Sequence, residues 1–221
     1  MIQRLHIDPY TRFALGFFLL ELMILVRNAL TGYWTFYWYC DFAPLFFGIF
    51  FLLRQYAAAK GLMYIGILGQ ITYLISFATT AFFNVPFLGF IIPPTYTLFE
   101  SIVTVIIHTS ACIAFAATAR VSPTPRSLTY SAAFLAGIYT AVRLTTEYAT
   151  SVDYNFNYIY STDILAAFPH LAPYYTALWI PIVFTVIVLP TYGIDNLIFF
   201  LYHQTPHLPH TPTRLVPQSA S

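Results

Sequence analysis

Long apolar segments alternate along the chain with short polar connections. The apolar segments cover residues 13–30, 36–53, 62–84, 96–118, 128–147 and 172–194. Each is about 20 residues long, which is the length of helix needed to cross a hydrocarbon core ~30 Å thick. The pattern therefore predicts an all-α polytopic membrane protein, a bundle of six transmembrane helices.

Basic residues lie in every second connection between these segments. They are Arg4 and Arg12 before the first segment, Arg54 and Lys60 after the second, Arg120 and Arg126 after the fourth, and Arg214 in the tail. Arginine and lysine accumulate in the cytoplasmic connections of membrane proteins. The distribution predicts that both termini are cytoplasmic, and we expect an integral protein of a prokaryotic plasma membrane.

The composition agrees with a membrane location and excludes several classes of function. The 221 residues are 59% hydrophobic and only 8% charged, unlike an ordinary soluble domain. The net charge of +1 argues against a nucleic-acid partner, so membrane lipid is the expected one. We expect a cytoplasmic arm at 1–12, one transmembrane domain at 13–203 and a disordered tail at 204–221. Motifs of soluble enzymes are absent, and no cofactor is predicted.

Seven ionisable side chains fall inside the apolar segments, where a charge is costly and usually faces the interior of the bundle. They are Glu21, Arg27, Asp41, Glu100, His108, Arg143 and Glu147. Counting ~1.5 Å per residue from the cytoplasmic arginines puts Cys40 at ~21 Å and His108 at ~18 Å. The sequence therefore predicts one polar site in the outer half of the membrane.

Cys40 and His108 suggest thiol chemistry in this site. The thiol would be the nucleophile, the imidazole its general base, and Asp41 or Glu100 would orient the ring. Pro44 removes the N–H that would bond the Cys40 carbonyl, so a bend beside the thiol is expected. The alternatives are that Cys40 is a small apolar residue at a helix contact and that His108 has a structural partner. No metal site is predicted.

Substrate contacts are expected from Arg143, Arg27, Trp38 and Tyr158. A guanidinium suits a lipid phosphate or a carboxylate because it donates two parallel hydrogen bonds. Alternatively, Arg27 extends to the headgroup region and Arg143 pairs with Glu147 one turn away. Tyr158 belongs to the long outer connection, residues 148–171. This connection is either a lid over the polar site or an interfacial anchor.

Three stretches resemble the YwaF-type integral membrane family and its eukaryotic relatives, the membrane acyltransferase and androgen-induced-hydrolase-like proteins. The stretches are Trp38-Tyr39-Cys40-Asp41-Phe42-Ala43-Pro44-Leu45, then Phe99-Glu100-Ser101 with Ile107-His108-Thr109, and the loop from Asn157-Tyr158-Ile159-Tyr160 through Asp163-Ile164-Leu165 to Pro173-Tyr174-Tyr175. This chain has Trp38 and Thr109 where the family usually has histidine and glycine. The resemblance implies acyl transfer on phospholipids, with Cys40 and His108 in the family's cysteine and histidine roles.

Two classes of function follow from these observations. The first is a lipid acyltransferase or lipid hydrolase that uses Cys40 and His108. The second is a non-enzymatic small transporter, channel or lipid-binding membrane protein whose interior is lined by the same polar groups. The expected gathering of charge in one half of the membrane, and the lack of an internal repeat, favour a lipid-facing pocket over alternating access.

Overall fold

The computed structural model describes residues 8–31, 39–85, 97–148 and 169–204, and within these ranges the chain is α-helical and contains no strand. The elements are α1 (Pro9–Thr31), α2 (Tyr39–Leu52), α3 (Tyr56–Phe83), α4 (Leu98–Ile107), α5 (Ser110–Thr118), α6 (Pro125–Tyr148), a 3-10 turn η3 (Pro169–Leu171), α8 (Ala172–Val183), a π-helical turn η4 (Phe184–Val188) and α9 (Leu189–Gln204). Since α4 and α5 lie on one path, as do α8, η4 and α9, these elements form six helical segments. The all-α class predicted from the sequence is confirmed.

Four of the segments are long and apolar enough to cross a membrane. Within the part of the chain that the structure describes, they are Pro9–Thr31, Tyr56–Phe83, Leu98–Thr118 and Pro173–Gln204. Helix α2 is apolar but only 14 residues long, whereas α6 has 24 residues and is more polar. A membrane location is therefore supported for the chain, and membrane crossing by α2 and α6 stays a prediction.

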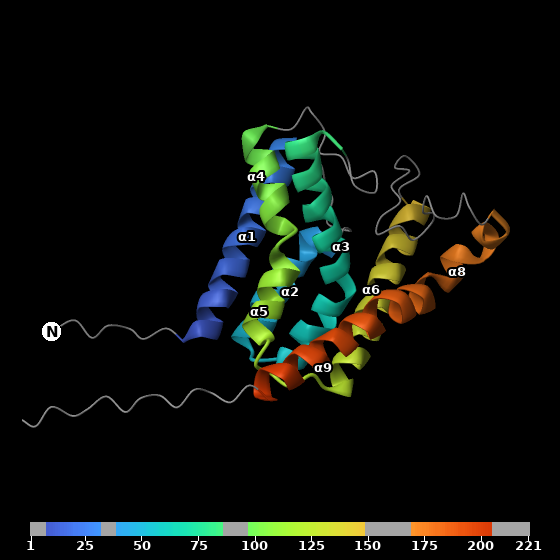
Figure 1. Ribbon diagram of the computed structural model, residues 1–221. Helices are drawn as coiled ribbons and strands as arrows, with labels where there is room; N and C mark the ends of the chain where they lie inside the picture. Colours follow the sequence, from blue (N-terminus) through green and yellow to red (C-terminus); the bar gives the residue numbers. More distant parts are fainter. Residues whose placement is uncertain (1–7, 32–38, 86–96, 149–168, 205–221) are drawn as a thin grey trace, which may run out of the picture.

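Helix α3 lies at the centre of the fold. In Figure 1, α1, α2, α4 and α5 lie on one side of it, α6 and α8 lie on the other, and α9 runs obliquely back across its end toward α5. Every residue from Ala58 to Ile67 is buried. A helix that is buried on all its faces over such a stretch must be surrounded by other helices. The N-terminal half of α3, which the distribution of basic residues predicts to lie toward the cytoplasm, therefore forms the core of the molecule.

The start of α1 is tied to the connection between α2 and α3. Asp8 caps α1 by accepting hydrogen bonds from the backbone N–H groups of Tyr10 and Thr11, at 3.0 and 3.2 Å. Arg54 lies 3.0 Å from the same carboxylate. The pKa of Asp8 lies below its ordinary value chiefly because the Thr11 hydroxyl donates to the carboxylate, with a smaller effect from Arg54.

The end of α9 lies at the same end of the bundle as the start of α1 (Figure 1). Arg120, in the connection between α5 and α6, places its guanidinium 5.4 Å from the ring centre of Tyr202 on α9. A guanidinium over an aromatic face is attracted to the ring. The two ends of the helical domain therefore share one side, and which side of the membrane this is stays a prediction.

Helices α3 and α6 approach closely at Gly61. The Ser131 hydroxyl donates to the Gly61 carbonyl at 2.7 Å. A Cβ atom on Gly61 would lie 2.6 Å from the Ser127 carbonyl oxygen and 2.7 Å from the Tyr130 Cβ. Small residues allow such contacts between membrane helices because the backbones can meet.

We predict that Gly61→Ala destabilises the protein by about 1–3 kcal/mol, because the added methyl group would meet backbone atoms that cannot move aside. Unfolding of the detergent-solubilised protein by titrated SDS measures this change. Gly69→Ala in the same helix is the matched control, since no atom lies within 4 Å of its Cβ position. It should be neutral or stabilising by up to about 1 kcal/mol. Equal stability of the two variants would contradict close packing at Gly61.

Candidate functional site

Arg27 of α1 and Asp41 of α2 form an ion pair in the interior of the bundle. The Nη2 atom of Arg27 lies 2.9 Å from Oδ2 of Asp41, and the side chains are 13% and 3% exposed. The Nε and Nη2 atoms also donate to the Asn28 side-chain oxygen, at 3.0 and 2.8 Å. The guanidinium therefore bridges two acceptors, and its charge is compensated where lipid could not solvate it.

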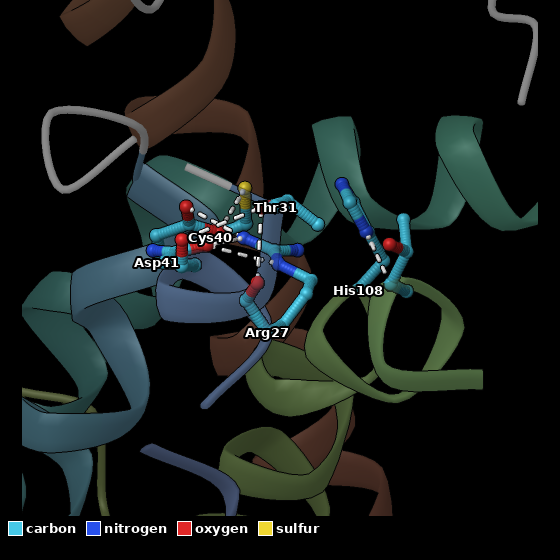
Figure 2. A network of polar contacts seen from close by, with 7 residues as sticks. Arg27, Thr31, Cys40, Asp41 and His108 are labelled. Atoms are coloured by element: carbon cyan, nitrogen blue, oxygen red, sulfur yellow. Dashed lines mark hydrogen bonds and ion pairs between the residues drawn. The ribbon is translucent and has the colours of Figure 1, made fainter. Parts of the chain in front are cut away.

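Cys40 lies beside this pair, as Figure 2 shows. Its sulfur is 3.8 Å from Oδ1 of Asp41, whereas Arg27 binds Oδ2 of the same carboxylate. Cys40 also packs against the small apolar core between α1 and α4. The buried members of that core are Leu20, Ile24, Val103 and Ile107. The thiol thus lies at the boundary between a charged pair and an apolar helix contact.

His108 occupies the break between α4 and α5, and Figure 2 shows it apart from the Arg27–Asp41 pair. Its Nδ1 atom lies 2.7 Å from the carbonyl oxygen of Thr104, which can only accept, so Nδ1 carries a proton. The ring stacks on Tyr73 of α3 with the ring centres 3.6 Å apart. In the described ranges no hydrogen bond joins His108 to Cys40. The nucleophile and base roles stay a prediction.

Gln70 of α3 satisfies the backbone at this break. Its amide nitrogen donates to the Ser110 hydroxyl at 2.9 Å and to the Ile107 carbonyl at 3.4 Å, while its oxygen accepts from the Ala111 N–H at 2.7 Å. A helix that breaks inside a membrane needs such partners. The sequence analysis did not identify Gln70, because an uncharged residue inside an apolar segment carries no distinct signal.

Glu100 has a structural role instead of a place beside the imidazole. Its carboxylate accepts from the Thr97 backbone N–H at 2.5 Å, and its own N–H donates to the Thr97 hydroxyl at 3.2 Å. This reciprocal arrangement is a capping box that begins α4. Since its hydrogen bonds go to Thr97, the structure does not bring Glu100 into contact with His108 or Cys40.

The remaining predicted residues are placed only in part. Arg143 is half-buried on α6, and Glu21 of α1 is buried, with no hydrogen-bond partner for Oε2 among the described residues. Trp38, Tyr158 and the side chain of Glu147 lie outside the described residues, as does most of the 148–171 connection.

A second polar cluster joins α3 to α9. The Lys60 ammonium lies 2.6 Å from Oδ2 of Asp195, and the Tyr64 hydroxyl donates to the same oxygen at 2.5 Å. Both charged side chains are 0% exposed. The sequence analysis placed Lys60 in a cytoplasmic connection, but α3 begins at Tyr56 and encloses it.

Asp195 was missed because the last segment was expected to end at residue 194, whereas α9 continues to Gln204. The prediction that polar groups gather in the outer half is therefore incomplete. A second buried ion pair lies nearer the other end of the bundle, four residues into α3.

The described ranges contain no group of three or more His, Cys, Asp or Glu side chains that could hold a metal ion. Comparison of the chain with family models, curated proteins and solved structures gave no match. The resemblance to the YwaF-type family therefore stays a prediction, and the geometry of the two ion pairs carries the functional argument.

We predict that Arg27 and Asp41 are energetically coupled. Asp41→Leu alone should cost about 3–5 kcal/mol because it leaves a buried guanidinium without its counter-charge, whereas Arg27→Met with Asp41→Leu should cost clearly less than the sum of the single changes. SDS unfolding of the four proteins of the cycle measures the coupling. The exposed pair Arg54–Asp8 is the control and should show no measurable coupling. Additive effects at Arg27 and Asp41 would contradict the pair.

Proposed function

We propose that the protein is a non-enzymatic small transporter, with an anion-binding site at Arg27 in the interior of its helix bundle. The observation that carries this proposal is the presence of two buried ion pairs, Arg27–Asp41 and Lys60–Asp195, each joining two helices. Buried charges in membrane bundles are costly and are characteristic of ion and substrate pathways.

The two pairs lie at different depths. Asp41 is eleven residues before the end of α2 at Leu52, and Lys60 is four residues after the start of α3 at Tyr56. At ~1.5 Å per residue, the pairs lie ~16 Å and ~6 Å from the connection between these helices. Polar groups at two levels favour a path through the bundle over a single pocket at the lipid surface.

Arg27 supports recognition of an anion. Asp41 binds the guanidinium through the Nη2–Oδ2 contact, and a ligand carboxylate or phosphate would replace Asp41 there. Asn28 would keep the guanidinium in place through its two hydrogen bonds. The released carboxylate of Asp41 would remain bonded to the Cys40 thiol. In this proposal the Arg27 guanidinium exchanges the carboxylate of Asp41 for the anionic group of the ligand.

We predict that inorganic phosphate raises the thermal stability of the purified protein and that Arg27 is required. A ligand at 100 times its Kd stabilises by about 2.7 kcal/mol. The shift should disappear in the Arg27→Met/Asp41→Leu variant and should be larger in Asp41→Asn, which lacks the competing charge. Arg54→Met controls for loss of a positive charge and should keep the shift. If phosphate stabilises all these variants equally, or none of them, the anion site is wrong.

Lipid acyl transfer is the second candidate, and one observation favours it. The Cys40 sulfur lies beside the Arg27–Asp41 ion pair, 3.8 Å from Oδ1 of Asp41. The other ring nitrogen of His108, Nε2, makes no hydrogen bond within the described ranges and can accept a proton. In this mechanism Nε2 would take the thiol proton while the sulfur attacks a lipid ester carbonyl, and the lipid alcohol would leave with that proton.

A lipid-chain haloacetamide tests this second candidate in a Cys112→Ala background, where Cys40 is the reactive thiol. Because the thiol is bonded to Asp41 and not to His108, we predict equal labelling rates with and without His108→Ala. A loss of labelling of about tenfold or more in His108→Ala would favour the enzyme, since a general base typically contributes at least 10²-fold. Tyr73→Phe, which keeps the stacked ring, is the control for local packing.

A further inference from the structure

Helix α9 faces the rest of the bundle with polar residues. Its buried residues in the described chain are Thr191 and Asp195, which lie one turn apart on the same face. Its large apolar side chains are exposed, and they include Leu189, Ile194, Leu197, Phe200 and Leu201. The attachment of α9 to α3 therefore rests on the Asp195 contacts together with the edge-on packing of Tyr192 against Tyr64.

The segment that contains α9 also has an interruption of its regular helical hydrogen bonding. Pro181 lies inside α8, the π-helical turn η4 follows at Phe184–Val188, and Pro190 lies in the first turn of α9. Each proline removes a backbone hydrogen bond, and π-helical turns are frequent where helices bend and function. In the most apolar 18-residue stretch of Pro173–Gln204, only 22% of the residues are buried, against 50% in the corresponding stretch of α3. These features make η4 the place where we expect α9 to bend relative to α8.

Asp195 has one carboxylate oxygen available. Lys60 and Tyr64 both bind Oδ2, whereas Oδ1 is buried and has no hydrogen-bond partner among the described residues. The groups facing the cluster are Lys60 and Tyr64 from α3, the Ser127 hydroxyl from α6, and Tyr192 of α9 itself, packed edge-on against Tyr64. Arg126 of α6 and His203 of α9 have other partners, the Tyr130 ring and the Phe199 carbonyl.

We propose that Asp195 is a proton-binding site and that protonation of its carboxylate releases α9 from α3. The proposal rests on the transport function proposed above and assigns the proton as the coupling ion. One proton from water bonds to Oδ1 and converts the carboxylate into a carboxylic acid, while Lys60 keeps its own proton. The net charge of the pair changes from zero to +1.

This change makes the closed arrangement unfavourable. The Lys60 ammonium loses its counter-charge in a site where its side chain is 0% exposed. An unpaired charge in a dry interior is strongly destabilising, so α9 must part from α3 until water reaches the ammonium. A metal cation does not fit the same site, because a single carboxylate is a poor ligand set and the ammonium would repel it.

Cysteine accessibility tests the movement in the full-length purified protein. Thr191→Cys, in a Cys40→Ala/Cys112→Ala background, places a thiol at a position that is 4% exposed on the face toward the bundle. Gly193→Cys on the same helix is the matched control, since no atom lies within 4 Å of its Cβ position. The ratio of the two rates with N-ethylmaleimide cancels the intrinsic pH dependence of thiols, which react as thiolates.

The ratio should rise as the pH falls, by at most about tenfold per pH unit, which is the limit for one proton. Asp195→Asn mimics the protonated acid, so its ratio should be high at every pH. Lys60→Met/Asp195→Leu replaces the pair by apolar side chains of similar volume, so it should fold and stay closed, with a low ratio at every pH. Asp41→Asn should keep the pH dependence.

A flat ratio in the parent protein would overturn the proposal, as would a pH dependence that persists in Asp195→Asn or in the double variant. Stabilisation by inorganic phosphate, measured on the same double variant, separates the two proposals. If phosphate still binds through Arg27 while the parent ratio is flat, the anion site stands and the proton site fails. If the ratio responds to pH but phosphate does not stabilise the parent, the proton site stands and the anion site fails.

Discussion

The buried ion pair between Lys60 and Asp195 is the constraint on which the rest of the structure depends. Membrane helices have no hydrophobic drive to associate, because lipid chains are as apolar as their side chains. A charge inside the bundle must find its counter-charge, since breaking a buried pair leaves a group that lipid cannot solvate. Asp195 therefore determines where α9 lies against α3, and Tyr64 determines which carboxylate oxygen is used.

Helix α3 is also held by contacts with other helices, besides the ion pair between Lys60 and Asp195. Gly61 brings α6 against its backbone, and Gln70 bonds both sides of the break between α4 and α5. Half of the residues in the most apolar 18-residue stretch of α3 are buried, which is the largest share among the candidate membrane spans of the described chain. In the proposed mechanism, α3 therefore stays in place while a change of charge at Asp195 moves α9, which belongs to the span whose most apolar stretch is the least buried of the described candidate spans.

The two ion pairs differ in a way that matches the two proposed roles. Arg27 is 13% exposed and has Asn28 as a second acceptor, which is what the proposed exchange of Asp41 for an external anion requires. Lys60 is 0% exposed, and Asp195 is its described acceptor, so no exchange is possible unless α9 moves. Cys40 borders the first pair and is bonded to Asp41, whereas His108 lies apart from the pair and is bonded to the Thr104 carbonyl.

The sequence by itself determined the features that depend on local composition. Helical class and the positions of the apolar segments follow from residues close together in the chain, although α3 begins before the expected residue 62 and α9 ends after the expected residue 194. Asp41 and Cys40 were expected in one site because they are adjacent. The Thr97–Glu100 spacing, a local capping signal, could also have been interpreted from sequence. Only the tertiary structure decided that Lys60 is buried and that Asp195 matters, because their contact spans 135 residues. A lysine at the edge of an apolar segment has the same local pattern whether it faces water or a counter-charge, and only its partner distinguishes the two.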